Sequence, residues 1–294
     1  MSQKTVWDTV VIVGVGLIGG SIGQALRKRK LARQVLGVGR RPAVLRTAVA
    51  RNAIDQASPD LEAAVRDADL VIVCTPLATI CKTVQAVRKS CRADTLITDV
   101  GSTKASIVGG VESAAGRSRS AVLGTFVGSH PIAGSDKSGV EFADPDLFDG
   151  RMTIVTPPSA ASFLAAHADS VEQVCDFWRS LGSRLALMTP EAHDEALAAT
   201  SHLPHLVASA LAGDTPLELR EFVGPGWRDT TRIAAADSSL WTEILIDNGR
   251  FTLQALDRLV KRLKAFRSAI GKLNSDELQH LLHEGKTSRD AMGN

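Results

Sequence analysis

A glycine-rich loop near the N-terminus has the residue types and the spacing to bind a dinucleotide. Gly14, Gly16 and Gly19 directly follow an apolar strand candidate and directly precede a helix candidate. The first glycine allows a tight turn, the second lets the backbone approach a pyrophosphate, and the third lets helix and strand pack closely. The pyrophosphate would lie on the positive N-terminus of that helix. Because strand, loop, helix and second strand occur at the expected spacing, the sequence predicts a dinucleotide site here rather than an ordinary glycine loop. The residues expected to contact the cofactor are Gly14, Gly16, Leu17, Ile18, Gly19 and Thr75.

An arginine pair after the second strand favours NADP over NAD. In NAD enzymes an Asp or Glu about 20 residues beyond the loop bonds the ribose 2′-hydroxyl. This strand instead ends in Gly39-Arg40-Arg41, without an acid. The glycine leaves room for a 2′-phosphate, and two guanidinium groups can clamp it. We therefore expect NADP as the cofactor, with NAD also possible, against the alternative that both arginines are solvated loop charges.

Three further segments combine turn residues with reactive side chains. Residues 99–104 (DVGSTK) and 128–139 (GSHPIAGSDKSG) follow strand candidates, whereas residues 226–234 (GWRDTTRIA) lie in the helical half of the chain. Ligands of open α/β sheets bind outside the carboxyl ends of the strands. We therefore expect the first two segments to lie beside the cofactor.

These segments give the chain a specific resemblance. It is similar to the prephenate/arogenate dehydrogenase family, the dehydrogenases of tyrosine biosynthesis. The matching segments are GVGLIGGS, DVGSTK, SHPIAGSDKSGVE, TSHLPH and RDTTRIA with a trailing LW. They extend from residue 14 to residue 241, so the resemblance covers nearly the whole chain. One departure is Gly224-Pro225-Gly226-Trp227, where many relatives have a run of glycines. Proline removes an amide donor, which puts any family role of that amide in doubt.

The resemblance implies an oxidative decarboxylation of a cyclohexadienol. In this family hydride passes from the ring carbon that bears the hydroxyl to the nicotinamide, the ring carboxylate leaves as CO2, and the ring becomes aromatic. The match implies that His130 is the base or hydrogen-bond acceptor for the ring hydroxyl, a task that suits a group titrating near the working pH. It also implies that Ser102 bonds the same hydroxyl and helps to orient His130. The alternative for His130 is a structural histidine that holds its loop.

Other matched residues are expected to bind the substrate. The resemblance implies that Arg232 clamps a substrate carboxylate, because its planar fork can bind one bidentately. Asp136 and Asp229 resemble the acidic residues of the family that pair with this arginine and gate the pocket. The alternative for both is a solvated salt bridge.

The two histidines of the segment TSHLPH, His202 and His205, are three residues apart and would share one face of a helix. No carboxylate or cysteine nearby completes a set of metal ligands, so a metal site is not expected. The resemblance instead implies substrate contact by His205, with His202 packing or capping. Trp241 is expected to line the substrate pocket, from its own or a partner subunit, and the alternative is a core aromatic.

The elements that must position these residues indicate an α/β fold. The first half alternates short apolar runs with helical patterns, which is typical of parallel β-α-β units. The runs are nearly continuous in apolar residues, as expected where helices cover both faces of a sheet. We predict a Rossmann-type, doubly wound parallel sheet over residues 1–157. The expected strands are Thr9–Val13, Gln34–Val38, Leu70–Cys74, Thr95–Asp99, Ala121–Gly128 and Met152–Val155, with helices at Ser21–Lys30 and Thr79–Lys89.

Residues 158–294 are predicted to form an all-α substrate and dimerisation domain. Ala161–Gly182 has apolar residues at helical spacing, and a short strand is expected at Arg184–Met188. From Glu191 onward the pattern is helical. A long apolar stripe there could pack within its own domain or against a second subunit, and we expect a homodimer. The stripe consists of Leu253, Leu256, Val260, Leu263, Phe266 and Ile270.

Composition excludes several classes of partner. The chain has 294 residues, 44% of them apolar, and a net charge of only +2 without a block of like charge. Nothing therefore indicates a nucleic-acid or membrane-surface partner. No apolar run approaches the roughly 20 residues that span a bilayer, and the N-terminus lacks the plan of a signal peptide. The four cysteines lack C-x-x-C spacing, which indicates reduced thiols, no metal site and a cytoplasmic protein.

Several alternatives stay open at this point. Prephenate and arogenate differ only at the side-chain end; we expect prephenate, the commoner bacterial-type substrate, and feedback inhibition by tyrosine is undecided. A β-hydroxyacid dehydrogenase or an imine reductase shares the two-domain design. However, the former uses a lysine in the helix joining the domains, and Ala161–Gly182 contains none. A non-catalytic NADPH-binding sensor would have no need of Ser102, His130 and Arg232 together.

Overall fold

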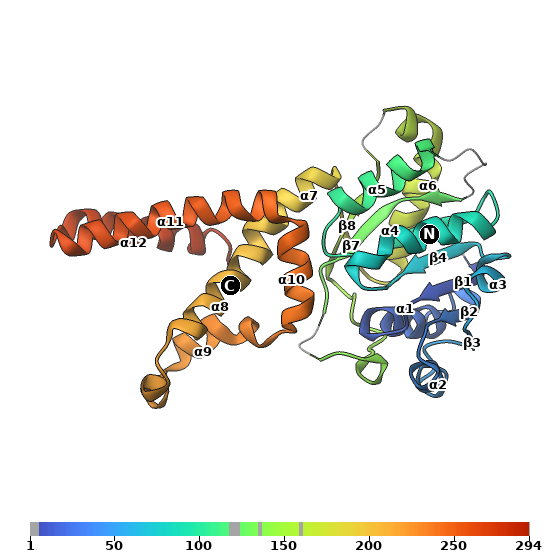
Figure 1. Cartoon of the computed structure of the whole chain (residues 1–294), viewed down its shortest axis with the longest axis horizontal. Helices are drawn as coiled ribbons and strands as arrows, with labels where there is room; N and C mark the ends of the chain where they lie inside the picture. The colour runs from blue at the N-terminus through green and yellow to red at the C-terminus, as the bar shows by residue number, and fades with distance from the viewer. Residues whose placement is uncertain (1–5, 118–123, 135–136, 159–160, 294) are drawn as a thin grey trace.

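The computed structural model describes residues 6–117, 124–134, 137–158 and 161–293. They form a nucleotide-binding body built on a parallel sheet, and a helical domain that projects from one side of it (Figure 1). The strands are β1 (Trp7–Val13), β2 (Ala32–Val38), β3 (Gln56–Ser58), β4 (Leu70–Val73), β5 (Leu96–Asp99), β6 (Thr125–Phe126), β7 (Gly128–Pro131), β8 (Met152–Thr156) and β9 (Arg184–Leu187). The helices of the body are α1 (Leu17–Lys28), α2 (Pro42–Ala50), α3 (Leu61–Val65), α4 (Leu77–Ser90), α5 (Ala105–Arg117), η1 (Val140–Phe142) and α6 (Ala161–Ser180).

The main sheet is the predicted Rossmann sheet. Its six strands run parallel in the order β3-β2-β1-β4-β5-β6, so strands are added on one side of β1 up to β3 and on its other side from β4 onward. Ligands bind at this switch point, outside the carboxyl ends of the strands. Side chains alternate along β1: Val10 and Ile12 enter one buried core, and Val11 and Val13 enter the other. Helices therefore cover both faces, which explains why the buried centres of these strands are almost entirely apolar.

The expected strands Ala121–Gly128 and Met152–Val155 do not both extend this sheet. Residues 121–123 lie outside the described part of the chain, and the parallel sheet ends at the two-residue β6. Beyond β6, side chains of β5 contact the following backbone: Thr98 Oγ1 donates to Val127 O (2.7 Å), and Ser129 N donates to Asp99 Oδ1 (3.1 Å). β7 pairs antiparallel with β8, and β8 pairs in parallel with β9, in a second, three-stranded sheet.

The predicted helix at Ala161–Gly182 and strand at Arg184–Met188 are present as α6 and β9. Both pack against β8, and the buried side chains of α6 include Val171, Phe177 and Trp178. Residues 161–187 thus lie with the nucleotide-binding body. We therefore propose to place the domain boundary between β9 and the next helix rather than at residue 158.

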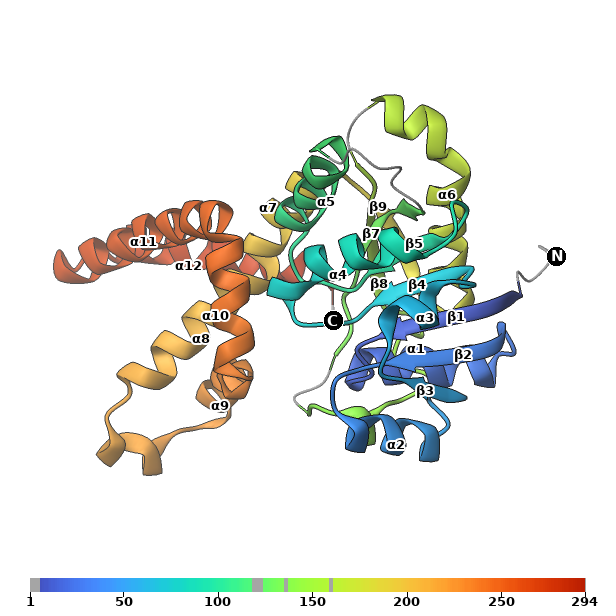
Figure 2. The same ribbon diagram turned by 45° about the vertical axis from the view of Figure 1, so that its right-hand side comes forward.

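The remaining chain is helical and forms two projections, which Figure 2 shows from a second side. One projection holds α8 and α9, and in the other α11 and α12 lie side by side. The apolar stripe predicted on α11 is largely uncovered: Leu253 is 61% exposed and Leu263 is 56% exposed. The helical elements are α7 (Pro190–Leu197), η2 (Ala198–His202), α8 (Leu203–Asp214), η3 (Leu217–Phe222), α9 (Pro225–Thr231), η4 (Arg232–Ala235), α10 (Ser238–Asp247), α11 (Gly249–Gly271) and α12 (Ser275–Asp290).

The two parts meet at the carboxyl end of β5. Asp247, at the end of α10, accepts hydrogen bonds from Thr103 Oγ1 (2.5 Å) and Ser106 Oγ (2.6 Å). α7 packs against α5 and β8, and α10 packs against α4. The helical domain therefore faces the edge of the sheet where a ligand would bind. Within the described residues, no helix is long and apolar enough to cross a membrane.

Candidate active site

The loop between β1 and α1 has the geometry of a dinucleotide cradle. Gly14 has a φ of 96°, and a Cβ there would lie 2.5 Å from Cys74 O. A Cβ on Gly19 would overlap the carbonyl oxygen of Gly14, so helix and loop could not pack this closely. A Cβ on Gly16 would meet no atom within 4 Å, so this backbone faces open space that a pyrophosphate can enter. α1 has no acidic side chain in its first turn, which leaves its positive end available to an anion.

The cofactor candidates around this loop also fit a dinucleotide. The hydroxyl of Thr75, just after β4, is buried, and it has no hydrogen-bond partner among the described residues. Beyond β2, a hollow of about 690 Å³ is lined by Gly39, Arg40 and Arg46. Arg41 is the N-cap residue of α2 and does not line this hollow. Arg46 was not predicted, although it lies only one helical turn into α2.

His130 lies on β7, and two residues of α7 connect to it. Its Nδ1 is 2.9 Å from Nε2 of His193, and Nδ1 of His193 is 2.7 Å from Oδ1 of Asp194. His193 is fully buried and His130 is partly exposed, so the chain of hydrogen bonds runs from the site into the core. His193 was not predicted, because it lies 63 residues from His130 in sequence. The only signal for it in the sequence is a histidine-aspartate pair near the start of a helix.

Burial keeps both rings neutral. It lowers the pKa of His130 well below the usual 6.5, and nearby positive charge on His193, Lys104 or His202 acts in the same direction. Burial also lowers the pKa of His193, although the hydrogen bond to Asp194 opposes this shift. A neutral His130 has one ring nitrogen with a lone pair, which is the form that can accept a proton.

A buried ion pair lies beneath His130. Lys104 Nζ donates to the Asp99 carboxylate and to Ser129 O (2.9 Å), and both charged side chains are fully buried. The indole of Trp178 donates to Ser129 Oγ (2.9 Å). Because Ser129 immediately precedes His130, this network fixes the backbone that carries the histidine.

Ser102 lies close in sequence to this network but does not hold His130. It is in the loop between β5 and α5 and is partly exposed. Within the described part of the chain, His193 and not Ser102 forms the hydrogen bond to the His130 ring. His193 occupies only Nδ1 of His130, so the role of Ser102 in orienting His130 through the substrate hydroxyl stays a prediction.

The histidines of the segment TSHLPH pack against Trp241. The rings of His205 and Trp241 are stacked, with centroids 3.6 Å apart. His202 is buried in the π-helical turn η2, and Asn248 Nδ2 donates to its Nδ1 (3.0 Å). Burial lowers the pKa of His202 to about 4 and lowers the pKa of His205 as well. His202 thus packs, as expected. Trp241 is partly exposed rather than a core aromatic.

The remaining substrate candidates are on the projection of α8 and α9. Arg232 is in η4, which packs against α8, and its side chain is exposed. Asp229 is exposed on α9, and it forms no ion pair with Arg232 in the described structure. The expected ion pair between these two residues is not formed in the described structure, where both side chains lie in solvent. Asp136 lies outside the described residues.

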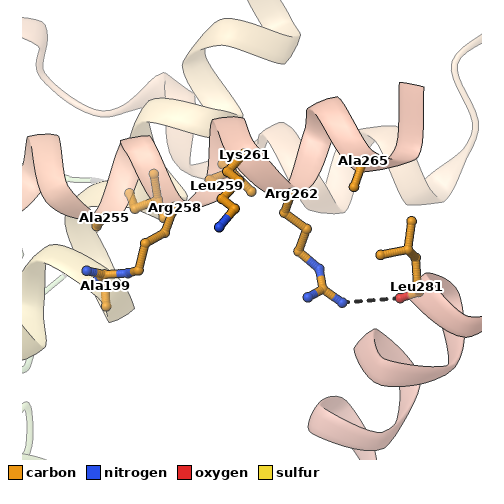
Figure 3. Close-up of a pocket in the computed structure, with 9 residues that line it drawn as sticks. Ala199, Ala255, Arg258, Leu259, Lys261, Arg262, Ala265 and Leu281 are labelled. Atoms are coloured by element: carbon orange, nitrogen blue, oxygen red, sulfur yellow. Dashed lines mark hydrogen bonds between the residues drawn. The ribbon is translucent and has the colours of Figure 1, made fainter. Parts of the chain in front are cut away.

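A separate pocket of about 510 Å³ lies in the helical domain between η2, α11 and α12 (Figure 3). Three basic side chains, Arg258, Lys261 and Arg262, line it beside alanines and leucines. Arg262 donates to Leu281 O (3.3 Å) and also pairs with Glu284 (2.8 Å). None of the site candidates described above lines this pocket. The described residues also contain no group of His, Cys, Asp and Glu side chains that could hold a metal ion.

The Rossmann strand order, the glycine cradle and a neutral histidine at the carboxyl end of the sheet define an NAD(P)-dependent oxidoreductase. Comparison with known families makes this class specific. Residues 22–187 match the nucleotide-binding domain of prephenate dehydrogenase, and residues 189–284 match its dimerization domain. The chain belongs to the prephenate dehydrogenase family, and this decides against a β-hydroxyacid dehydrogenase or an imine reductase.

Individual relatives are similar over nearly the whole chain. A cyclohexadienyl dehydrogenase of Zymomonas mobilis is 30% identical over 98% of this chain and 97% of its own length. A prephenate dehydrogenase of Lactococcus lactis is 32% identical over 96% of this chain and 77% of its own length. The crystal structure of prephenate dehydrogenase from A. aeolicus, in complex with hydroxyphenyl propionate and NAD+, has 30% identity and a TM-score of 0.87, covering 99% of this chain and all (100%) of that one.

Proposed function

We propose that this protein catalyses the oxidative decarboxylation of prephenate to 4-hydroxyphenylpyruvate, with NADP as the preferred cofactor. The observation that carries the proposal is His130, which burial keeps neutral at the carboxyl end of the sheet. A base at this position can take the proton of a substrate hydroxyl while hydride leaves the same carbon. Family membership supports the choice of a cyclohexadienol as that substrate.

The residues of the chain divide the chemistry between them. A bound NADP would supply the hydride acceptor. His130 accepts the ring hydroxyl proton as the carbon–oxygen bond gains carbonyl character. When the ring carboxylate leaves as CO2, its bonding electrons complete the aromatic ring, and the phenol oxygen regains the proton. Ser102, at the neighbouring strand end, is assigned a hydrogen bond to the same hydroxyl.

Arg232 is assigned to a carboxylate of the substrate. It is exposed and forms no salt bridge to any described carboxylate, so its fork is available for a bidentate contact. η4 packs against α8, which carries His205 with its ring stacked on Trp241. Nδ1 of His205 is buried without a hydrogen-bond partner among the described residues, which supports a substrate contact by this residue. Asp229 remains a candidate for gating the pocket.

The preference for NADP rests on the hollow beyond β2. Arg40 and Arg46 line it together with Gly39, and no acidic residue lines it. Two guanidinium groups can bind a 2′-phosphate, whereas an NAD enzyme needs a carboxylate there. The test compares kcat/KM for NADP and NAD in wild-type protein and in Arg40→Glu. We expect NADP to be preferred and the substitution to remove that preference; a wild-type preference for NAD would contradict the assignment.

The activity is tested by formation of reduced nicotinamide with prephenate and with arogenate, each with both cofactors. We expect prephenate with NADP to give the highest kcat/KM. His130→Asn should lower kcat by about 10²- to 10⁴-fold, the range over which a general base contributes. Turnover that persists in His130→Asn would refute the role of this residue, and a preference for arogenate would change the substrate.

We further propose that the protein is a homodimer through α8 and α11. These helices form an apolar groove of about 770 Å³ lined by Leu206, Val207, Leu256 and Leu263, among others. An exposed apolar surface of this kind marks an interface, and the match to a dimerization domain supports a second copy as its partner. Light scattering should give the dimer mass for wild-type protein and a smaller mass for Leu263→Asp. Leu187→Asp, at a residue 60% exposed on β9, is the matched control.

A further inference from the structure

Asp194 anchors the chain of hydrogen bonds that leads to His130. Its Oδ1 accepts from Lys104 N (2.8 Å), and its Oδ2 accepts from Ala105 N (2.9 Å), at the N-terminus of α5. Asn248 Nδ2 also donates to its backbone carbonyl (2.7 Å). A carboxylate held by two backbone amides has a fixed orientation, and these contacts also join the helical domain to the nucleotide-binding body.

The hydrogen bonds that link His130, His193 and Asp194 permit only one arrangement of protons on the two imidazole rings. An ionised carboxylate can only accept, so Nδ1 of His193 donates to Asp194. In a neutral His193, Nε2 then has the lone pair and accepts from Nδ1 of His130. His130 Nδ1 therefore carries the proton, and its Nε2 is left with a lone pair.

We propose that His193 and Asp194 are positioning residues that fix His130 in the tautomer whose Nε2 accepts the substrate hydroxyl proton. The catalytic consequence rests on the proposed function. The tautomer itself is a property of the protein without substrate, so it can be measured separately. In the opposite tautomer, Nε2 of His130 would carry the proton. It would then present N–H to the substrate hydroxyl and could not act as the base.

The same contacts give the proton a route during the reaction. As the substrate O–H bond breaks, the new N–H bond forms at Nε2 of His130. The proton on Nδ1 of His130 can then pass across a single hydrogen bond of 2.9 Å to Nε2 of His193. The positive charge thereby comes to lie beside the Asp194 carboxylate. Return of both protons restores the neutral pair when the phenol oxygen is protonated, so no further reactant is needed.

Several other ionisable groups face this pair, and they set the background for any pH measurement. From the nucleotide-binding body, the ion pair of Lys104 and Asp99 lies beneath the two rings. From the helical domain, His202 acts on both histidines through η2. Asp247 bonds to the loop before α5 and acts on Lys104.

The tautomer is tested by 15N–1H correlation spectra of the histidine side chains in the full-length protein without ligand. His130→Asn assigns the His130 signals by their loss. We expect wild-type His130 to show a protonated Nδ1 and an unprotonated Nε2. His193→Ala should give signals averaged between the two tautomers, whereas His193→Gln should keep the wild-type pattern because its amide oxygen can accept from Nδ1. Unchanged His130 signals in His193→Ala would overturn the proposal.

Kinetics provide the second test. His193→Ala should lower kcat by about 10²-fold, the lower range of a general-base contribution, with KM changed by less than about 3-fold. The acid limb of its pH–kcat profile should move to higher pH, because water that enters the cavity reduces the desolvation that lowers the pKa of His130. His193→Gln should recover most of the rate. An unmoved acid limb with a KM rise equal to the kcat loss would count against positioning.

Asp194→Asn and Asp247→Asn form a matched pair of controls. Both residues accept hydrogen bonds from the start of α5 or the loop before it, but only Asp194 contacts His193. Oδ1 of Asp194 accepts from both Lys104 N and His193 Nδ1, and Oδ2 accepts from Ala105 N. Asp194→Asn has a single oxygen for these three donors, so its NH2 group must face at least one N–H and the support of His193 is disturbed; kcat should therefore fall. Asp247→Asn should leave the acid limb in place. If wild-type protein oxidises neither substrate, the proposed function fails, while the spectra still decide the tautomer.

Discussion

Trp241 of α10 is stacked on His205 of α8, with ring centroids 3.6 Å apart and an interplanar angle of 5°. The stack joins two helices and covers the imidazole, and burial lowers the pKa of His205. Trp241→Ala should therefore loosen His205 and raise KM for the substrate by about 2- to 12-fold, which corresponds to the 0.5–1.5 kcal/mol typical of an aromatic pair. Trp241→Phe should keep most of the affinity. Equal KM values in all three proteins would show that the stack does not support substrate binding.

The glycine loop allows substitutions that separate folding from cofactor binding. A Cβ on Gly19 would overlap the carbonyl oxygen of Gly14, whereas one on Gly16 would enter open space. Gly19→Ala should lower the melting temperature of the protein without ligand. Gly16→Ala should melt like the wild type but bind NADP more weakly, because the new methyl occupies space needed by the pyrophosphate. Scanning calorimetry and cofactor titration distinguish the two, and equal NADP affinity in Gly16→Ala would contradict the assigned cradle.

Removing one partner of the buried ion pair between Lys104 and Asp99 should strongly lower the free energy of unfolding. Lys104→Met leaves the Asp99 carboxylate buried without its cation, which costs about 3–5 kcal/mol in comparable sites. Urea unfolding measures the loss. Lys286→Met is the matched control, because Lys286 and Asp290 are exposed and such pairs contribute about 0–1 kcal/mol. Similar losses in both variants would mean that burial does not decide the effect.

The sequence predicted the sheet well because its strands are buried on both faces. β1, β2, β4 and β5 agree with the expected runs to within about two residues, since continuous apolar residues were enough to locate them. β3 was not predicted, because the strand has only three residues and these are mostly exposed. The change of sheet after β6 was also missed, because the side chains that contact the backbone there, Thr98 and Asp99, lie far from β7 in sequence.

The candidate site was predictable where a motif placed several residues together. The glycine loop directly follows β1, and His130 lies on β7, next to Ser129, which bonds to Asp99 at the carboxyl end of β5. His193 and Asn248 were missed because tertiary hydrogen bonds, to His130 and to Asp194, bring them to the site, and no local pattern reports such contacts. Arg46 could have been found: with Pro42 as the first residue of a helix, a residue four positions later lies on the same face.

His202 should make the stability of the protein fall in acid. Burial lowers the pKa of His202 to about 4 in the folded protein, from the ordinary value of 6.5 that applies in the unfolded chain. Between pH 4 and pH 6.5 the unfolded chain therefore binds more protons than the folded protein. The free energy of unfolding therefore falls as pH decreases from 6.5 through 4, by up to roughly 1.4 kcal/mol per pH unit for one proton. His130, His193 and His205 act in the same direction because burial also lowers their pKa values. Urea unfolding across this window should give a shallower slope for His202→Asn, whose amide oxygen can still accept from Asn248. His280→Asn, at an exposed position, is the control, and equal slopes in both variants would contradict the assignment to His202.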